Sequence, residues 1–192
     1  MTTTKDLPVL LFKTQEEWEQ WLEKNHSQAD GVWLQMYRKD TGLLSVNYAQ
    51  ALEEALCYGW IDGMVKSYNE TSFIQKFTPR RAKSIWSERN TKHIERLTAA
   101  GKMKPAGIAE VEKAKADGRW EKAYTSWSGA AVPEDFLTAL NKNKKAKAFF
   151  GTLSKQNLYA IYFRLQNAKK PETRAKRIAT FVQMLERGEK FH

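Results

Sequence analysis

The strongest constraint on the fold is the place where the period of the hydrophobic pattern changes. Strand-like segments, in which apolar residues alternate or form short runs, all lie before residue 80, and only helix-like spacing follows. Alternation with period two is typical of strands, whereas recurrence at three and four residues is typical of helices. Strands grouped in one part of a chain predict an α+β fold. We therefore expect a small, mostly antiparallel sheet packed against helices, followed by a C-terminal helical bundle.

Five segments are expected to form the sheet. Residues 9–12 are expected to be a short buried strand, and in residues 32–38 apolar and polar side chains alternate. Trp60 and Ile61 begin a third strand, where Asp62-Gly63 predicts a bulge or tight bend. Residues 64–68 and 72–78 are predicted to pair as two strands joined by a turn.

Helix boundaries are marked by capping residues. Thr14 and Glu17 have the capping-box pattern, Ser45 or Asn47 can cap the next helix, and Gly59 is expected to close it in a left-handed conformation. Ser84 or Ser87 can cap a third helix, which ends at Gly101. Further helices are predicted at 105–118, 134–150, 154–168 and 171–187.

The charge is distributed unevenly along the chain. Residues 1–128 carry 19 Lys and Arg against 17 Asp and Glu, whereas residues 129–192 carry 13 against 5. The segment "WEKAYTSWSGAAVPEDF" is irregular and rich in small residues. We therefore predict an α+β domain at 1–128 and a basic helical domain at 129–192.

Several classes of protein are not favoured by the sequence. No apolar run approaches the ~18 residues of a membrane span, and no signal peptide is recognisable, so we expect a cytoplasmic location. Cys57 is the only cysteine and the three histidines are isolated, so we expect no metal site and no cofactor. Neither a glycine-rich nucleotide loop nor a nucleophile elbow occurs. The oligomeric state is left open.

One central constellation combines tryptophans, cations and hydroxyl groups. Guanidinium groups, serine hydroxyls and a helix N-terminus could converge on a phosphate, sulfate or carboxylate. The alternative is structural: Asp62 pairs with Arg80, the serines cap a helix, and the tryptophans lie in the core. Asp62 is also a weak candidate for a general acid or base. The constellation consists of Trp60, Asp62, Arg80, Arg81, Lys83, Ser84, Trp86, Ser87 and Asn90.

A second candidate is the basic tail. Between Lys142 and Arg177 the chain carries eleven basic residues and one acidic residue, and aromatic residues are interleaved with them. Cations with aromatics can follow a phosphate backbone and stack bases, so a polyanion such as nucleic acid is a possible partner. The alternative is a solvated charged face over an aromatic core. The candidate cations are Lys144, Lys145, Lys147, Lys169, Lys170, Arg174, Lys176 and Arg177.

Four segments together resemble the YdeI/OmpD-associated, or bacteriocin-protection, family. The resemblance covers residues 9–189, and its motifs are specific in combination, above all "GWIDG" with "FTPR" and the closing "AKKPETRAKRI". The final third is similar to the helical domain by which the family is recognised. The segments are "GVWLQMYRKDTGLLSVNYAQALEEALCYGWIDG", "FTPRRAKSIWSERN", "GKMKPAGIAEVEKAKADGRW" and "AKKPETRAKRIATFVQMLERGE".

The resemblance implies resistance to cationic antimicrobial peptides or bacteriocins, association with an outer-membrane porin, and a periplasmic location. It implies no catalytic residues. On the strength of the resemblance, the ligand-binding candidates are Trp60, Asp62, Gly63, Arg80, Ser84, Trp86, Ser87 and Asn90, with Pro79 beside them.

Two hypotheses of function follow. The first is a non-enzymatic binding protein of a stress-response or antimicrobial-tolerance type, which engages an anionic ligand through the central pocket, the basic tail, or both. The second is an enzyme that acts on a small phosphorylated or carboxylated metabolite, with Arg80 holding the anion and Asp62 as acid or base. Oligomerisation through exposed aromatic residues is a third hypothesis.

Overall fold

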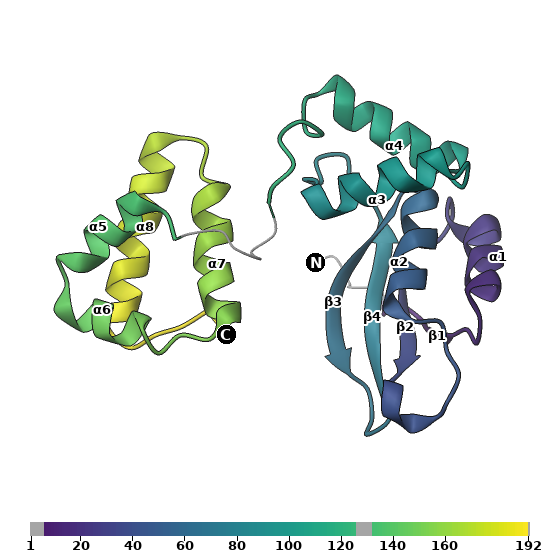
Figure 1. The fold of residues 1–192 in the computed structure, drawn as a ribbon, viewed down its shortest axis with the longest axis horizontal. Helices are drawn as coiled ribbons and strands as arrows, with labels where there is room; N and C mark the ends of the chain where they lie inside the picture. The colour runs from purple at the N-terminus through teal and green to yellow at the C-terminus, as the bar shows by residue number, and fades with distance from the viewer. Residues whose placement is uncertain (1–5, 126–131, 192) are drawn as a thin grey trace. The chain divides into compact units, whose positions relative to one another are not determined.

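A computed structural model describes residues 6–125 and 132–191 of the chain (Figure 1). The chain divides into two compact units, Met1–Thr125 and Ser126–His192. The domain boundary predicted near residue 129 lies in the segment 126–131, outside the described residues.

The N-terminal unit contains a four-stranded sheet with the strand order β1-β2-β4-β3. β1 runs parallel to β2, and the other two neighbouring pairs are antiparallel, so the sheet is mixed but mostly antiparallel. The predicted α+β fold with a C-terminal helical region is confirmed. The strands are β1 (Val9–Leu11), β2 (Val32–Tyr37), β3 (Trp60–Ser67) and β4 (Ser72–Pro79).

The alternation predicted for β2 is confirmed, because Val32, Leu34 and Met36 are buried and the residues between them are partly exposed. The predicted bulge is confirmed by a register shift between Asp62 and Val65. The prediction that the first strand is buried is wrong: Val9 and Leu11 are 39% and 40% exposed. β1 lies at an edge of the sheet, and only its central residue packs against the core.

Three helices of this unit begin at capping side chains. Thr14 accepts a hydrogen bond from the amide of Glu17, and Ser87 accepts one from that of Asn90. The capping box predicted at Thr14 is not closed, because the Glu17 carboxylate accepts the Lys13 amide instead. The helices are α1 (Gln15–Asn25), the 3₁₀ turn η1 (Lys39–Thr41), α2 (Tyr48–Cys57), α3 (Glu88–Ala99) and α4 (Pro105–Ala116).

The core of the N-terminal unit lies between the sheet and these helices. Trp18 of α1 is fully buried and its ring meets those of Trp60 and Phe77 at centroid distances of 6.5 and 5.8 Å. Gly59 ends α2 with a φ of 74°, which confirms its predicted left-handed conformation. A side chain there would also meet the backbone of Ala106 at 3.0 Å.

The C-terminal unit is helical in its described residues. One helix was expected over 134–150, but two are present, because the side chain of Asn143 accepts the amide of Ala146 and starts a new helix. Phe136, Leu165 and Phe181 are buried in a separate core. The helices are α5 (Glu134–Asn141), α6 (Lys144–Phe150), α7 (Lys155–Gln166) and α8 (Pro171–Glu186). Across the described parts of both units, no helix has the length and apolar character to cross a membrane.

Candidate functional site: two cavities that share Arg80

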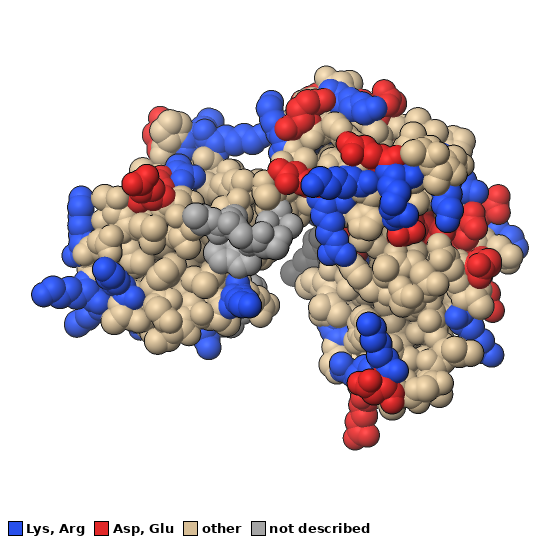
Figure 2. Space-filling model, in the orientation of Figure 1, with Lys and Arg blue, Asp and Glu red and all other residues tan. Residues whose placement is uncertain are grey.

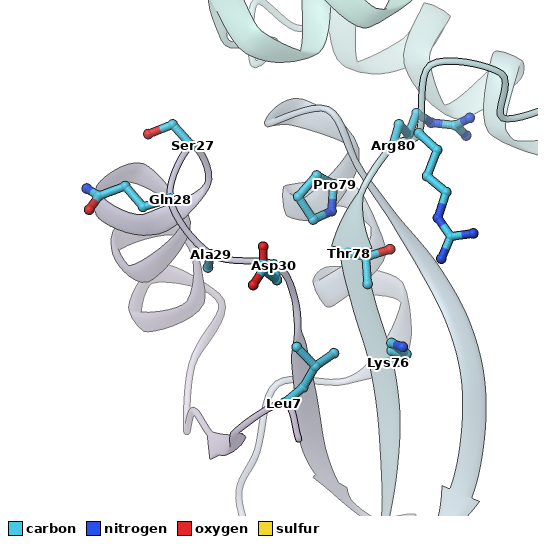
Figure 3. Close-up of a pocket in the computed structure, with 10 residues that line it drawn as sticks. Leu7, Ser27, Gln28, Ala29, Asp30, Lys76, Thr78, Pro79 and Arg80 are labelled. Carbon is cyan, nitrogen blue, oxygen red and sulfur yellow. The ribbon is translucent and has the colours of Figure 1, made fainter. Parts of the chain in front are cut away.

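One cavity of the N-terminal unit has a volume of about 530 Å³. It lies between the segment that follows α1 and the C-terminal end of β4, and Figure 3 shows Asp30 and Thr78 on its two sides. Three cationic side chains and one carboxylate line it. The lining residues are Leu7, Ser27, Gln28, Ala29, Asp30, Lys76, Thr78, Pro79, Arg80 and Arg81.

Gly31 explains why the segment after α1 runs so close to β4. Its φ is 144°, and a Cβ atom there would lie 2.7 Å from Cγ2 of Thr78 and 2.8 Å from the carbonyl oxygen of Phe77. Atoms cannot approach so closely, so only glycine allows this path. Gly31 therefore holds the segment after α1, which forms one wall of the cavity, against β4, which forms the other wall.

A second cavity, of about 390 Å³, shares Ser27, Pro79 and Arg80 with the first. His26 lines it with its ring 5.2 Å from that of Tyr58, and its Nδ1 lies 2.9 Å from the carbonyl oxygen of Leu22. The other lining residues are Tyr58, Gly59, Trp60, Ala106, Ala109, Glu110 and Lys113. The two cavities therefore adjoin at these three shared residues.

Arg80 is the only charged residue that lines both cavities, and it is buried, with 8% of its surface exposed. Its Cζ lies 3.4 Å from the ring centroid of Trp86, and its Nη1 donates to the carbonyl oxygen of Ile85 at 3.4 Å. Its Nε has no hydrogen-bond partner. Burial lowers the pKa of Arg80 to about 10, although the charge of Asp62 opposes this shift.

Arg80 forms no ion pair within 4.0 Å with any acidic side chain in the described segments. A buried cation that lacks a paired anion is destabilising, because its lost hydration is only partly replaced. At neutral pH the group is nevertheless charged, since its pKa stays well above 7. An anion that enters either cavity would supply a nearby counter-charge for this guanidinium.

The predicted pairing of Asp62 with Arg80 does not form. Asp62 accepts a hydrogen bond from the hydroxyl group of Tyr48 at 2.9 Å, and it lines neither cavity. Burial, together with the charge and hydrogen bond of Asp62, raises the pKa of Tyr48 well above its ordinary value. The hydroxyl therefore stays protonated and holds the carboxylate as an acceptor.

The other predicted site residues mainly build the surrounding structure. Trp60 lines the second cavity, but it is 1% exposed and its Nε1 donates to the carbonyl oxygen of His26. Ser87 caps α3, and the hydroxyl of Ser84 accepts the amide of Arg81 within a turn. The carbonyl oxygen of Gly63 accepts a hydrogen bond from Gln75. Trp86, Ser87 and Asn90 are buried beside these contacts and line neither cavity.

Thus the structure brings Trp60, Pro79, Arg80 and Arg81 of the predicted residues to the cavities, and it adds residues that the sequence analysis did not select. Lys76 and Thr78 alternate along β4, and their spacing of two was a usable signal once the strand was recognised. No sequence pattern pointed to Ser27, Gln28 and Asp30 as site residues, because nothing in the sequence places the segment after α1 against β4. Among the described residues, no group of three or more His, Cys, Asp or Glu side chains could hold a metal ion.

The eight predicted cations of the C-terminal unit fall into two groups. The six lysines are exposed. Arg174 makes an ion pair with Asp135 and donates to the carbonyl oxygen of Leu165, while Arg177 donates to that of Arg164. Figure 2 shows Lys and Arg side chains over the visible face of this unit with few Asp and Glu, whereas both signs are interspersed over the N-terminal unit.

Two family models match the chain. Residues 10–110 match a domain of unknown function, DUF8412, and this segment makes up more than half of the chain. The chain belongs to the DUF8412 family. Residues 130–188 match the model described as bacteriocin-protection, YdeI or OmpD-associated, which confirms the resemblance found in the sequence for this part of the chain. No curated protein and no solved structure matches the chain.

The DUF8412 match covers most of the unit that contains both cavities. The bacteriocin-protection, YdeI or OmpD-associated match covers α5 to α8. The described helical unit and the cavity-bearing unit therefore correspond to two separate family domains on one chain.

Proposed function

We propose that this DUF8412 protein binds a small anionic ligand, a phosphate or carboxylate compound, in the cavities that adjoin at Arg80. The observation that carries the proposal is the state of the Arg80 guanidinium. This group is buried and charged, within the described residues it forms no ion pair, and its Nε–H has no hydrogen-bond acceptor there. Lys76 and Arg81 add two further cations around the larger cavity. Ligand pockets of several hundred Å³ with a few convergent polar groups are typical of small-molecule sites.

Binding without catalysis is the simpler form of this function. The enzymatic alternative depends on Asp62, and that carboxylate is held by Tyr48 outside both cavities. No observation in the described residues places a second acid or base beside Arg80 at hydrogen-bond distance. The bacteriocin-protection description belongs to the matched family, and we propose anion binding as the biochemical activity behind a tolerance role.

Isothermal titration of the full chain with inorganic phosphate, sulfate and citrate, at constant ionic strength, tests the proposal. Arg81 and Lys83 form a matched pair: both are exposed cations of one loop, but only Arg81 lines a cavity. We expect Arg81→Ala to weaken binding about tenfold or more, as loss of a charge-assisted hydrogen bond does. Lys83→Ala is expected to leave the affinity unchanged.

Equal losses in both variants would mean that the anion is attracted by diffuse surface charge, and the proposed site would be wrong. Absence of binding for all three anions would also contradict the proposal.

A second candidate function is polyanion binding by the C-terminal unit. Six of its predicted cations are exposed lysines that make no ion pair with an acidic residue in the described segments. Polyphosphate, which has charge but no bases, is the suitable probe. Replacing Lys144, Lys145, Lys169 and Lys170 by glutamine is expected to flatten the salt dependence of polyphosphate affinity, because fewer counterions are released. An unchanged slope would contradict this second function.

A further inference from the structure

The sheet of the N-terminal unit has one face that the core does not use. Val32, Leu34 and Phe77 belong to the core cluster on the helix side. The residues that alternate with them point to the opposite face, and the register places Trp33 beside Lys76 and Lys66 beside Ile74. Trp33 and Tyr37 are partly exposed and are not members of the core cluster, whereas Ile74 is buried on this face.

Trp33 lies on this open face, with two lysines over its ring. The Nζ of Lys66 is 4.8 Å from the ring centroid of Trp33, and the Nζ of Lys76 is 6.0 Å from it. The indole is partly exposed, as is the ring of Tyr37 on the same strand. An aromatic ring on an open sheet, with lysines of β4 and β3 over it, is suited to stack a nucleobase when the lysine side chains move from the ring to the adjacent phosphates.

The charge of the open face is positive. Its described strand positions carry two lysines and no Asp or Glu: Val9, Leu11, Trp33, Gln35, Tyr37, Ile61, Lys66, Ser72, Ile74, Lys76 and Thr78. Lys76 also lines the larger cavity, next to Arg80 and Arg81. The cations therefore continue from the middle of the face into the cavity at its end.

We propose that this open face binds single-stranded nucleic acid, with one base stacked on Trp33 and phosphates contacted by Lys66, Lys76 and Arg81. A single strand is favoured over a duplex because an unpaired base exposes its face for stacking, whereas a base in a duplex is already stacked. Charge complementarity selects this partner over an apolar one. The inference rests on the proposed function to the extent that the two sites share Lys76 and Arg81.

The test uses the full chain and two labelled strands of twelve nucleotides, one of deoxythymidine and one abasic, followed by fluorescence anisotropy. We expect Trp33→Ala to weaken binding of the deoxythymidine strand about 5- to 100-fold and to leave the abasic strand unaffected. Trp33→Phe keeps a ring for stacking and the packing of β2, so it is expected to lose less and to remain folded.

Lys66→Gln and Lys92→Gln form the control pair. Both lysines are exposed, but Lys92 belongs to α3 and lies off the sheet face. We expect only Lys66→Gln to lower the log-log salt slope, by about 0.7 for the one phosphate contact removed.

Wild-type affinity in both Trp33 variants, or equal affinity of the wild-type chain for the two strands, would overturn the inference. Inorganic phosphate separates this result from failure of the proposed function. If phosphate binds and depends on Arg81 while strand binding ignores Trp33, the inference alone fails. If phosphate does not bind, the proposed function fails, and the Trp33 dependence still decides the inference.

Discussion

The guanidinium of Arg80 lies over the indole of Trp86, with 3.4 Å between its Cζ and the ring centroid. The contact fixes a charged group at the wall shared by two cavities, while the ring of Trp86 is itself held by Trp120 at a centroid distance of 5.0 Å. Stacking on an aromatic face attracts a cation but leaves its in-plane N–H groups available. The arrangement therefore orients donors without neutralising them.

Replacing Arg80 by methionine separates stability from binding. An apolar side chain of similar length removes a buried charge that has no paired anion, so the free energy of unfolding is expected to change by less than about 1 kcal/mol. Phosphate binding is expected to disappear. Urea unfolding, followed by tryptophan fluorescence, and calorimetric titration measure the two effects. A loss of several kcal/mol in Arg80→Met would show that Arg80 is structural.

Gly107 allows α4 to pack directly on the end of α2. A Cβ atom at this position would lie 2.2 Å from the carbonyl oxygen of Cys57. We expect Gly107→Ala to lower the free energy of unfolding of the N-terminal unit by about 2–3 kcal/mol, because the backbone of α2 must move. Gly151→Ala is the control, since its nearest contact would be 3.4 Å away. Equal stability of the two variants in thermal unfolding would refute the close packing.

Asp135 of α5 and Arg174 of α8 tie two helices of the C-terminal unit together. The Arg174 guanidinium lowers the pKa of the Asp135 carboxyl below its ordinary value. A lowered pKa contributes stability above the ordinary value of 3.8, and this is lost as the pH falls through the folded-state pKa. We expect Asp135→Asn to cost about 0.5–1 kcal/mol at pH 7 and progressively less in acid.

Amide hydrogen exchange in α5 and α8 measures this cost. Glu189→Gln is the control, because the pair of Glu189 with Arg187 is exposed and joins no two helices. Identical exchange rates in Asp135→Asn and the wild type at pH 7 would show that the ion pair between Asp135 and Arg174 does not stabilise the unit.

The pKa of Glu54 is shifted in the opposite direction from that of Asp135. Its side chain is buried at α2, where it accepts a hydrogen bond from Gln15, and burial raises its pKa. Stability associated with a raised pKa is complete at low pH and is lost as the pH rises through the folded-state value. Glu54→Gln keeps the acceptor and removes the charge, so we expect it to be more stable than the wild type at pH 7.

The difference between Glu54→Gln and the wild type is expected to vanish as the pH falls below the ordinary value of 4.5. Urea unfolding monitored by tryptophan fluorescence suits this test, since six of the seven tryptophans lie in residues 1–125. A pH-independent difference would contradict the assignment to the Glu54 charge.

Local sequence patterns predicted most of the helices and strands. The alternation in β2, the caps at Thr14, Asn47 and Ser87, and the left-handed Gly59 each depend on residues within a few positions of one another. Errors arose where tertiary position decides. The exposure of β1 depends on its place at the sheet edge, and the break before α6 depends on which way one asparagine side chain turns.

The candidate site was predictable only in part for the same reason. Arg80 stood out by its neighbours in sequence, but Asp62 turns to Tyr48 instead, across a separation of 14 residues. The wall that contains Asp30 approaches β4 through Gly31, a contact between positions almost fifty residues apart. Spacing along the chain identifies candidates for a site, whereas the pairing of distant segments decides which of them meet.

The most direct test of the central claim observes the Nε–H group of Arg80 itself. In ¹⁵N-labelled full-length protein, its cross-peak can be assigned by its absence in Arg80→Lys and then followed during titration with sulfate. We predict a saturable shift of this signal at sulfate concentrations that leave the Nε–H signals of Arg187 and Arg38 in place. Saturable binding that moves other signals while the Arg80 Nε–H signal stays fixed would contradict the account.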